Sequence, residues 1–180
     1  MILSFSSFGE VKSILGYFDD KSYWLNIPDG FYKDANNAAR IGAIFLLIPD
    51  GYDFNSAPAI IYSAVYSDKI AKDAISFDVD KFKSRAPQLT VKDTQKEISS
   101  AGKEVLFKEF IDPSSKQQPY EVVSYVQEGD SVVTVVMSAF QEKGYNHLLP
   151  AFINMAKSYE SSTIKVLNKS IQSTAKAATN

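Results

Sequence analysis

Residues 131–140 form a segment that is apolar on both sides when it is drawn as a β-strand. Successive side chains of a strand point to opposite faces. Here they divide into two largely apolar sets: Val133, Val135, Met137 and Ala139 on one face, and Val132, Thr134, Val136 and Ser138 on the other. A strand of this kind is covered on both sides. The chain is therefore expected to place further layers above and below a central strand.

Two more apolar segments precede this strand, at residues 105–111 and 120–126. Gly129 supplies hairpin chemistry before the third strand, so the tight connections predict an antiparallel meander. A helix is expected next, packed on the sheet, because six apolar residues follow at helical spacing. They are Tyr145, Leu148, Leu149, Phe152, Met155 and Tyr159. Pro150 is expected near the first turn of this helix, where a missing N–H is tolerated.

The N-terminal half predicts further strands at residues 22–27, 41–48 and 58–66, which alternate or are rich in β-branched and aromatic residues. The tripeptide Pro-Asp-Gly closes the first strand at residues 28–30 and closes the second at residues 49–51. Proline sets the first turn angle and glycine relieves the last position. Residues 32–40 are polar and predict a loop or one helical turn.

A short helix is expected over residues 76–85, capped by Ser76 or Asp78 and stopped at Ala86, which precedes a proline. Residues 89–100 fit a helix and an alternating strand equally, so both remain open. Residues 1–161 are expected to form one domain. Beyond Ser161 the chain becomes polar, and residues 162–180 are expected to be a tail or an extra helix.

The composition narrows the function classes. Lys plus Arg number 19 and Asp plus Glu 21, without a strong basic cluster, which argues against nucleic-acid binding. The absence of cysteine excludes disulfides and thiolate chemistry, and it suits an oxidising compartment although it does not exclude the cytosol. Residues 1–10 do not form an intact signal peptide. No apolar run is long enough to predict a membrane span.

Catalytic and cofactor motifs are absent from the sequence: a nucleophile elbow, a glycine-rich phosphate loop, a dinucleotide fingerprint and a zinc-binding His-Glu-x-x-His. No cofactor or metal is therefore predicted. His147 is the only histidine and is expected on the surface or at a helix cap. An enzyme would have to bring His147 together with Asp78 and Asp80, whereas these aspartates fit a helix start equally well. Residues 19–20, both aspartate, are expected in a solvated turn.

Aromatic residues beside the predicted turns suggest a contact surface, since tyrosine and tryptophan dominate interface hot spots. The alternative is that these side chains fill the core, as strand aromatics often do. The candidate residues are Trp24, Phe31, Tyr32, Tyr52 and Phe54.

The order of these elements resembles the PsbP-like superfamily over roughly residues 20–160. The similarity lies in the two strand-Pro-x-Gly-aromatic turns, in Ser124, Tyr125 and Gly129 of the hairpin, and in the final helix around residues 152–158. Members include the photosystem II extrinsic protein PsbP, a Ran-binding nuclear import factor and small bacterial proteins of unknown function. The resemblance implies an α/β (α+β) fold, with a central antiparallel sheet of about six strands sandwiched by helices.

The resemblance also implies a binding or assembly module without hydrolytic or redox chemistry. We therefore expect a noncatalytic protein-interaction or accessory module, bacterial and exported to the periplasm or beyond, with a cytoplasmic location as the alternative. Its partner is expected to be another protein. A small-molecule or apolar-ligand carrier is the second hypothesis, and an enzyme the third.

Overall fold

The structure is a computed structural model that describes residues 12–94, 96–115 and 119–163. Its helices are α1 (Ala35–Ile41), α2 (Ala71–Arg85) and α3 (Glu142–Lys157). Its strands are β1 (Ser13–Phe18), β2 (Lys21–Asn26), β3 (Phe31–Lys33), β4 (Phe45–Pro49), β5 (Ala59–Tyr66), β6 (Thr90–Asp93), β7 (Glu97–Ile98), β8 (Glu104–Ile111), β9 (Tyr120–Glu128), β10 (Ser131–Ala139) and β11 (Glu160–Thr163).

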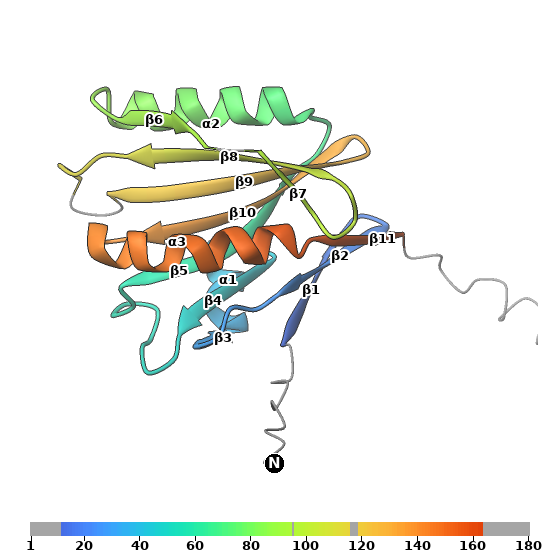
Figure 1. Ribbon diagram of the computed structural model, residues 1–180, viewed down its shortest axis with the longest axis horizontal. Coiled ribbons are helices and arrows are strands. Elements are labelled where there is room, and N and C mark those ends of the chain that lie inside the picture. The colour runs from blue at the N-terminus through green and yellow to red at the C-terminus, as the bar shows by residue number, and fades with distance from the viewer. Residues whose placement is uncertain (1–11, 95, 116–118, 164–180) are drawn as a thin grey trace, which may run out of the picture.

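The strands form two sheets, and every pairing between described strands is antiparallel. The larger sheet has eight strands in the order β3-β4-β5-β10-β9-β8-β6, with β7 also paired to β8. The smaller sheet has the order β1-β2-β11. The mixed α and β architecture expected from the sequence is confirmed, but the main sheet is larger than the six strands predicted (Figure 1).

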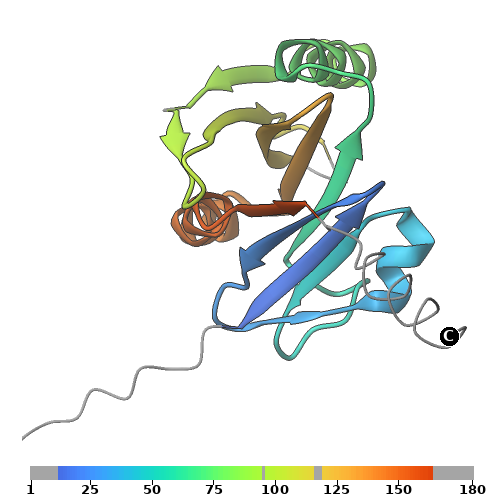
Figure 2. The ribbon, with the colours of Figure 1, turned by 90° about the vertical axis from the view of Figure 1, so that its right-hand side faces the viewer.

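Strand β10 lies in the middle of the large sheet, between β5 and β9, and all of its side chains are buried. One face of the sheet is covered by α3 together with the small sheet, and the other face by α2 and α1 (Figure 2). The prediction of a strand covered on both sides is confirmed. Helices alone do not supply the cover, because a second sheet shares one face with α3.

The small sheet is joined to the large one through a buried tyrosine. The Tyr23 hydroxyl donates to Ser63 Oγ at 2.6 Å, because Ser63 Oγ in turn donates to the Thr134 carbonyl oxygen at 2.7 Å. The Tyr23 ring also stacks on Tyr159, with 5.6 Å between ring centroids. The Tyr23 hydroxyl is buried, but it has a hydrogen-bond partner. The side chain can therefore fill the core and also link the small sheet to the large one.

The repeated Pro-Asp-Gly turns lie side by side. Both glycines adopt a positive φ, 77° at Gly30 and 83° at Gly51, as the turn chemistry predicts. The Asp50 N–H donates to the Gly30 carbonyl oxygen at 2.7 Å. The two similar strand exits therefore join the edge strand β3 to β4.

The predicted helix at residues 76–85 begins five residues too late, since α2 starts at Ala71. Its N-cap, Ile70, has no side-chain hydrogen bond to the helix, so the expected Ser76 or Asp78 cap is wrong. Instead, the Ala71 N–H donates to Gln127 Oε1 from strand β9, at 2.7 Å. A cap supplied from a distant strand leaves no signal in the local sequence.

Several boundaries differ from the prediction for local reasons. The polar segment at residues 32–40 contains most of β3 and α1, and α1 is capped by Asp34, which accepts from the Asn37 N–H at 3.0 Å. Gly42 ends this helix with φ 70°, so β4 begins at Phe45 rather than at residue 41. The open segment at residues 89–100 forms strands β6 and β7.

The C-terminal helix also begins earlier than predicted, at Glu142, which places Pro150 inside α3 instead of near its first turn. Strands β1 and β11 were not predicted. Because β11 runs from Glu160 to Thr163, the boundary expected after Ser161 cuts through a strand. The remaining residues expected as a tail or helix, 164–180, lie outside the described residues.

Two glycines, one packed against Tyr23 and one in open space on α3, predict opposite effects of a change to alanine. A Cβ at Gly16 would lie 2.2 Å from Tyr23 Cζ, whereas a Cβ at Gly144 in α3 meets nothing within 4 Å. Gly16→Ala should lower the free energy of unfolding by about 1–3 kcal/mol, the usual cost of overpacking. Gly144→Ala should raise it by up to about 1 kcal/mol, because alanine favours a helix. Urea denaturation measures both, and a neutral Gly16→Ala would contradict the packing described.

Candidate binding site beneath helix α2

The catalytic set that an enzyme hypothesis required does not converge. Asp78 lies in α2 and His147 in α3, and these helices cover opposite faces of the large sheet (Figure 1). Asp80 and His147 are exposed, whereas Asp78 is buried. The prediction of a surface histidine is confirmed, and the solvated turn at residues 19–20 is confirmed as the exposed connection between β1 and β2.

Asp78 is bound by two tyrosines of the sheet below α2. Tyr66 of β5 donates to Asp78 Oδ1 at 2.5 Å, and Tyr125 of β9 donates to Asp78 Oδ2 at 2.8 Å. Burial, together with this carboxylate, raises the pKa of both tyrosines, so their hydroxyls remain protonated donors. Each carboxylate oxygen thus receives one hydrogen bond that compensates part of its desolvation.

Glu121 of β9 is a second buried carboxyl on the same face of the sheet, with 2% of its surface exposed. Ser138 donates to its Oε1 at 2.8 Å and Tyr62 donates to the same oxygen at 3.4 Å. Desolvation raises its pKa to about 7, although these two hydrogen bonds oppose the shift. The carboxyl therefore changes charge near neutral pH.

Two cavities meet at Glu121. The first, about 130 Å³, lies between α2 and strands β5, β9 and β10. Its wall consists of Tyr62, Ala64, Tyr66, Asp78, Lys81, Phe82, Glu121, Val123, Thr134 and Val136. The second, about 330 Å³, lies at the C-terminal end of α2 and shares Phe82 and Glu121 with the first. We call the two together the α2 groove.

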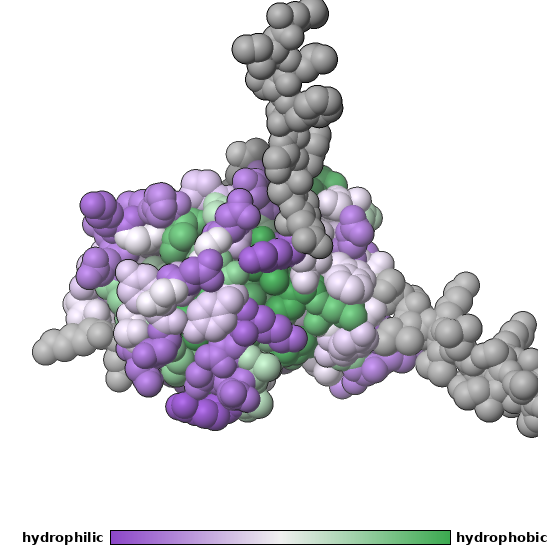
Figure 3. Space-filling model, turned by 90° about the horizontal axis from the view of Figure 1, so that it is seen from below, coloured by the Kyte–Doolittle hydropathy of each residue, from purple (hydrophilic) through white to green (hydrophobic). Residues whose placement is uncertain are grey.

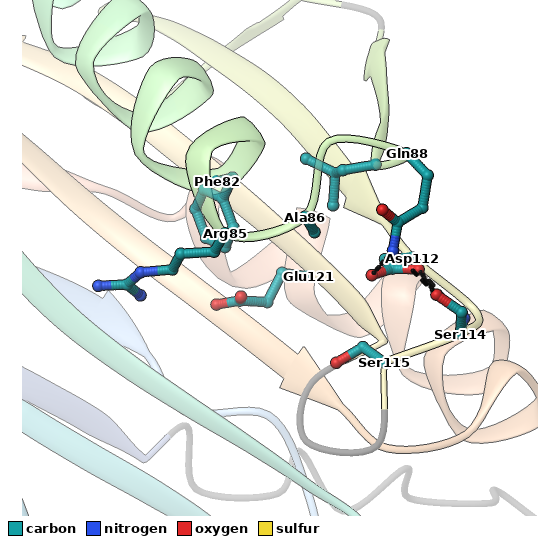
Figure 4. Close-up of a pocket in the computed structure, with 9 residues that line it drawn as sticks. Phe82, Arg85, Ala86, Gln88, Asp112, Ser114, Ser115 and Glu121 are labelled. Atoms are coloured by element: carbon teal, nitrogen blue, oxygen red, sulfur yellow. Dashed lines mark hydrogen bonds between the residues drawn. The ribbon is translucent and has the colours of Figure 1, made fainter.

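Figure 4 shows the second cavity, with Arg85 and Glu121 on one side and Asp112, Gln88 and Ser114 on the other. Asp112, Gln88 and Ser114 form hydrogen bonds with one another. Gln88 Nε2 donates to Asp112 Oδ2 at 3.2 Å and to Ser114 Oγ at 3.1 Å, while Ser114 Oγ donates to Asp112 Oδ1 at 2.5 Å. Glu121 differs, because its Oε2 makes no hydrogen bond to the residues described.

Neither Asp78 nor Glu121 forms an ion pair within residues 12–94, 96–115 and 119–163. Over the same residues, no three or more histidine or acidic side chains gather as a metal site would require. The groove thus presents carboxyl groups, hydroxyl groups and aromatic rings, with the basic residues Lys81 and Arg85 also in its walls. These side chains are suited to binding a small ligand through its charge and its shape.

The sequence contained an unused signal for Glu121. It stands between Tyr120 and Val122 in a predicted strand, and the alternation of that strand places it on the same side as Val123 and Tyr125. A carboxylate on an apolar face is unusual unless it is paired. Tyr62 and Ser138, which contact it, come from other strands and could not be assigned before the pairing was known.

The five aromatic residues predicted as a contact surface lie in different places. Tyr32 of β3 and Tyr52 of the loop after β4 are exposed and adjacent, since the Tyr32 hydroxyl donates to the Tyr52 carbonyl oxygen at 2.9 Å. Phe54 is half-buried against the core below α1, with Arg40 over its ring. Trp24 is exposed on β2 of the small sheet. Phe31 is 4% exposed and fills the core, so it cannot be part of a surface.

No helix in the described part of the chain combines the length and the apolar character that crossing a membrane requires.

The burial of Glu121 predicts a pH-dependent stability. The unfolded chain ionises this group near pH 4.5, whereas the folded protein holds the proton until about pH 7, so native stability falls as the pH rises between these values. Glu121→Gln cannot ionise, so relative to the native protein it should gain about 3 kcal/mol of unfolding free energy between pH 4.5 and pH 8.

Urea denaturation across this pH range measures the difference. Asp80→Asn, which removes an exposed carboxylate from α2, is the matched control and should keep the native pH profile. Parallel profiles for Glu121→Gln and the native protein would show that the carboxyl is not desolvated as described.

Comparison with solved structures identifies the fold. The solution structure of cyanobacterial PsbP (CyanoP) from Synechocystis sp. PCC 6803 aligns with a TM-score of 0.52 and 15% identity, over 89% of this chain and 99% of that chain. The Saccharomyces cerevisiae Ran-binding protein Mog1p aligns at 0.49, and a mutant form of Mog1 at 0.50, both with 12% identity over 84% of this chain and 95% of theirs. No family model and no curated protein matches the sequence. The protein therefore has the PsbP-like fold that its sequence resembles.

Proposed function

We propose that this protein is a noncatalytic protein-interaction module that binds a protein partner at the end of the large sheet where β3 lies. The observation that carries the proposal is the exposed pair Tyr32 and Tyr52, held together by the hydrogen bond between the Tyr32 hydroxyl and the Tyr52 carbonyl. Rigid, exposed tyrosines supply contact area at a low entropic cost. We call these two residues, with Phe54 and Arg40, the β3-end surface.

The backbone around these residues supports a docking role. Strand β3 pairs only with β4 within the described sheet, so its other edge carries unpaired backbone groups that a partner can meet. Arg40 is held near the Phe54 ring, 5.7 Å from its centroid, by a hydrogen bond from the guanidinium to Asn37 Oδ1 at 2.8 Å. Arginine and aromatic residues are enriched at interface centres.

The charge of this end indicates what kind of partner fits. The segment from β3 to the loop after β4, with the turn before β3, contains Lys33 and Arg40 as its only basic residues against four aspartates: Asp29, Asp34, Asp50 and Asp53. Complementary charge steers association and favours a partner with basic groups. The partner is thus expected to present lysine or arginine beside an apolar contact.

The Saccharomyces cerevisiae protein Mog1p, compared above, is described as Ran-binding. An exported bacterial location completes the proposal, motivated by the absence of cysteine, which avoids mispaired disulfides in an oxidising compartment.

Trp24 offers a separate contact area on the small sheet. The pairing of Trp24 with Leu15 places both on the outer face, where Tyr17 also lies. In Figure 3, which views the molecule from below, hydrophobic residues gather near the middle of the face and are bordered by polar ones. Contiguous apolar surface of this kind often marks an interaction site.

A small-molecule carrier is the second candidate, and the α2 groove is the observation that favours it. The walls of its larger cavity include Arg85, Gln88, Asp112 and Glu121, which are polar or charged. A polar or charged ligand therefore fits better than the apolar ligand expected from the sequence.

The β3-end surface can be tested by site-specific photocrosslinking in cells of the source organism. A photoreactive phenylalanine analogue at position 52 should form a protein adduct, whereas the same analogue at position 77 should not. Phe77 of α2 is the matched control because Tyr52 and Phe77 are each 47% exposed. Tyr32→Ala should reduce the adduct at position 52 at least fivefold without changing the thermal midpoint.

Two outcomes would contradict the proposal. Identical adducts at positions 52 and 77 would indicate nonspecific contact, and an unchanged adduct in Tyr32→Ala would show that this tyrosine is not part of the interface.

A further inference from the structure

The smaller cavity of the α2 groove combines buried negative charge with aromatic walls. Asp78 and Glu121 both line it, and neither has a cationic partner at ion-pair distance in the described part of the chain. Asp78 is 5% exposed and Glu121 is 2% exposed. Buried charges in proteins are normally paired or bind a cation. Lys81 also lines the cavity, but within the described residues it forms no ion pair with either carboxyl, so neither has a directly bound counter-charge.

Three aromatic side chains form much of the wall: Tyr62 and Tyr66 from β5 and Phe82 from α2. The tyrosine hydroxyls are already committed as donors to Glu121 and Asp78, which fixes the rings in place. An aromatic face attracts a cation through its quadrupole, most strongly when the cation is desolvated. The aromatic rings and the carboxyl groups thus both favour a cation as the ligand.

The shape of the cavity selects the class of cation. Its volume is about 130 Å³, and Ala64, Val123 and Val136 contribute apolar surface to its wall. A metal ion requires several oxygen ligands at short distance, and among the described residues no three or more acidic or histidine side chains gather to supply them. A cation that carries its own alkyl groups can contact the walls while its charge faces the carboxyls.

We propose that this cavity binds a small organic ammonium cation, with the alkylated nitrogen between the rings of Tyr62, Tyr66 and Phe82 and its charge balanced by Glu121 and Asp78. Glu121 Oε2, for which the described residues supply no hydrogen bond, is the atom available to a ligand. The site lies beneath α2, and the proposal does not depend on the protein-docking role of the β3-end surface.

The other charged groups around the cavity set its pH dependence. Lys81 of α2 lines the cavity, is exposed and favours the ionised form of Glu121. Arg85 and Asp112 line the adjoining cavity, while Tyr66 and Tyr125 hold Asp78 from the sheet. Lys81 competes for the same negative charge, so its removal should strengthen ammonium binding.

The direct test is calorimetric titration of the full chain at pH 8 with choline and with 3,3-dimethyl-1-butanol, its uncharged isostere. Choline should bind saturably, and the neutral isostere should bind at least tenfold more weakly, because only the charge differs between them. n-Butylammonium serves as a second cationic probe and should also bind better than the alcohol. These three titrations use the native protein and need no variant that could unfold.

The pH dependence and the variants locate the site. Choline affinity should rise by about tenfold between pH 6 and pH 8, as Glu121 loses its proton around pH 7. Glu121→Gln should remove this rise and weaken binding at pH 8 at least tenfold, while Lys81→Ala should strengthen it. Asp80→Asn, on the exposed side of α2, is the matched control and should bind choline as the native protein does.

The proposal is overturned if choline and its neutral isostere bind equally, if neither cation binds saturably, or if Glu121→Gln keeps native affinity and pH dependence. Loss of the crosslink at position 52 would not affect it, and absence of choline binding would leave the β3-end surface intact, so the two proposals fail separately.

Discussion

The burial of β10 on both faces is the constraint on which the rest of the structure depends. A strand with valine on either side is stable only when both faces are removed from water. One face obtains its cover from α3 and the small sheet, and the other from α2 and α1. The small sheet exists in this form because Tyr23 reaches Ser63 and stacks on Tyr159, which ties β2 and β11 to the core.

The two faces of the large sheet differ in the side chains that they bury. The face below α3 and the small sheet is a continuous apolar cluster with a few hydrogen-bonded hydroxyls, while the face below α2 contains the carboxyls of Asp78 and Glu121. Burying these groups costs stability, which the tyrosine and serine donors offset only in part. A fold that needed only stability would place apolar residues here. The α2 groove is therefore the feature that the packing of the core does not explain, and the cation binding that we propose would account for it.

The shared fold with CyanoP and Mog1 covers most of the chain at 15% and 12% identity, so it describes the path of the backbone and leaves the recognition surfaces to this sequence. Tyr32 and Tyr52 on one end of the sheet and Glu121 beneath α2 are side chains on that shared frame. The aromatic residues were visible in the sequence, but their exposure was not. Phe31 and Tyr32 are neighbours, yet strand alternation buries the first and exposes the second.

The sequence by itself determined the elements whose signal is local: the meander from β8 to β10, the β5 strand, the amphipathic character of α3 and the two Pro-Asp-Gly turns, because periodicity and turn chemistry act between near neighbours. Only the tertiary structure decided where α2 begins, since Gln127 caps it from β9. It also decided that β1 and β11 pair with β2, that Tyr62, Asp78 and Glu121 line one cavity, and that Ser138 donates to Glu121. These contacts join residues distant in the chain, so they depend on strand order and register, which local propensities do not specify.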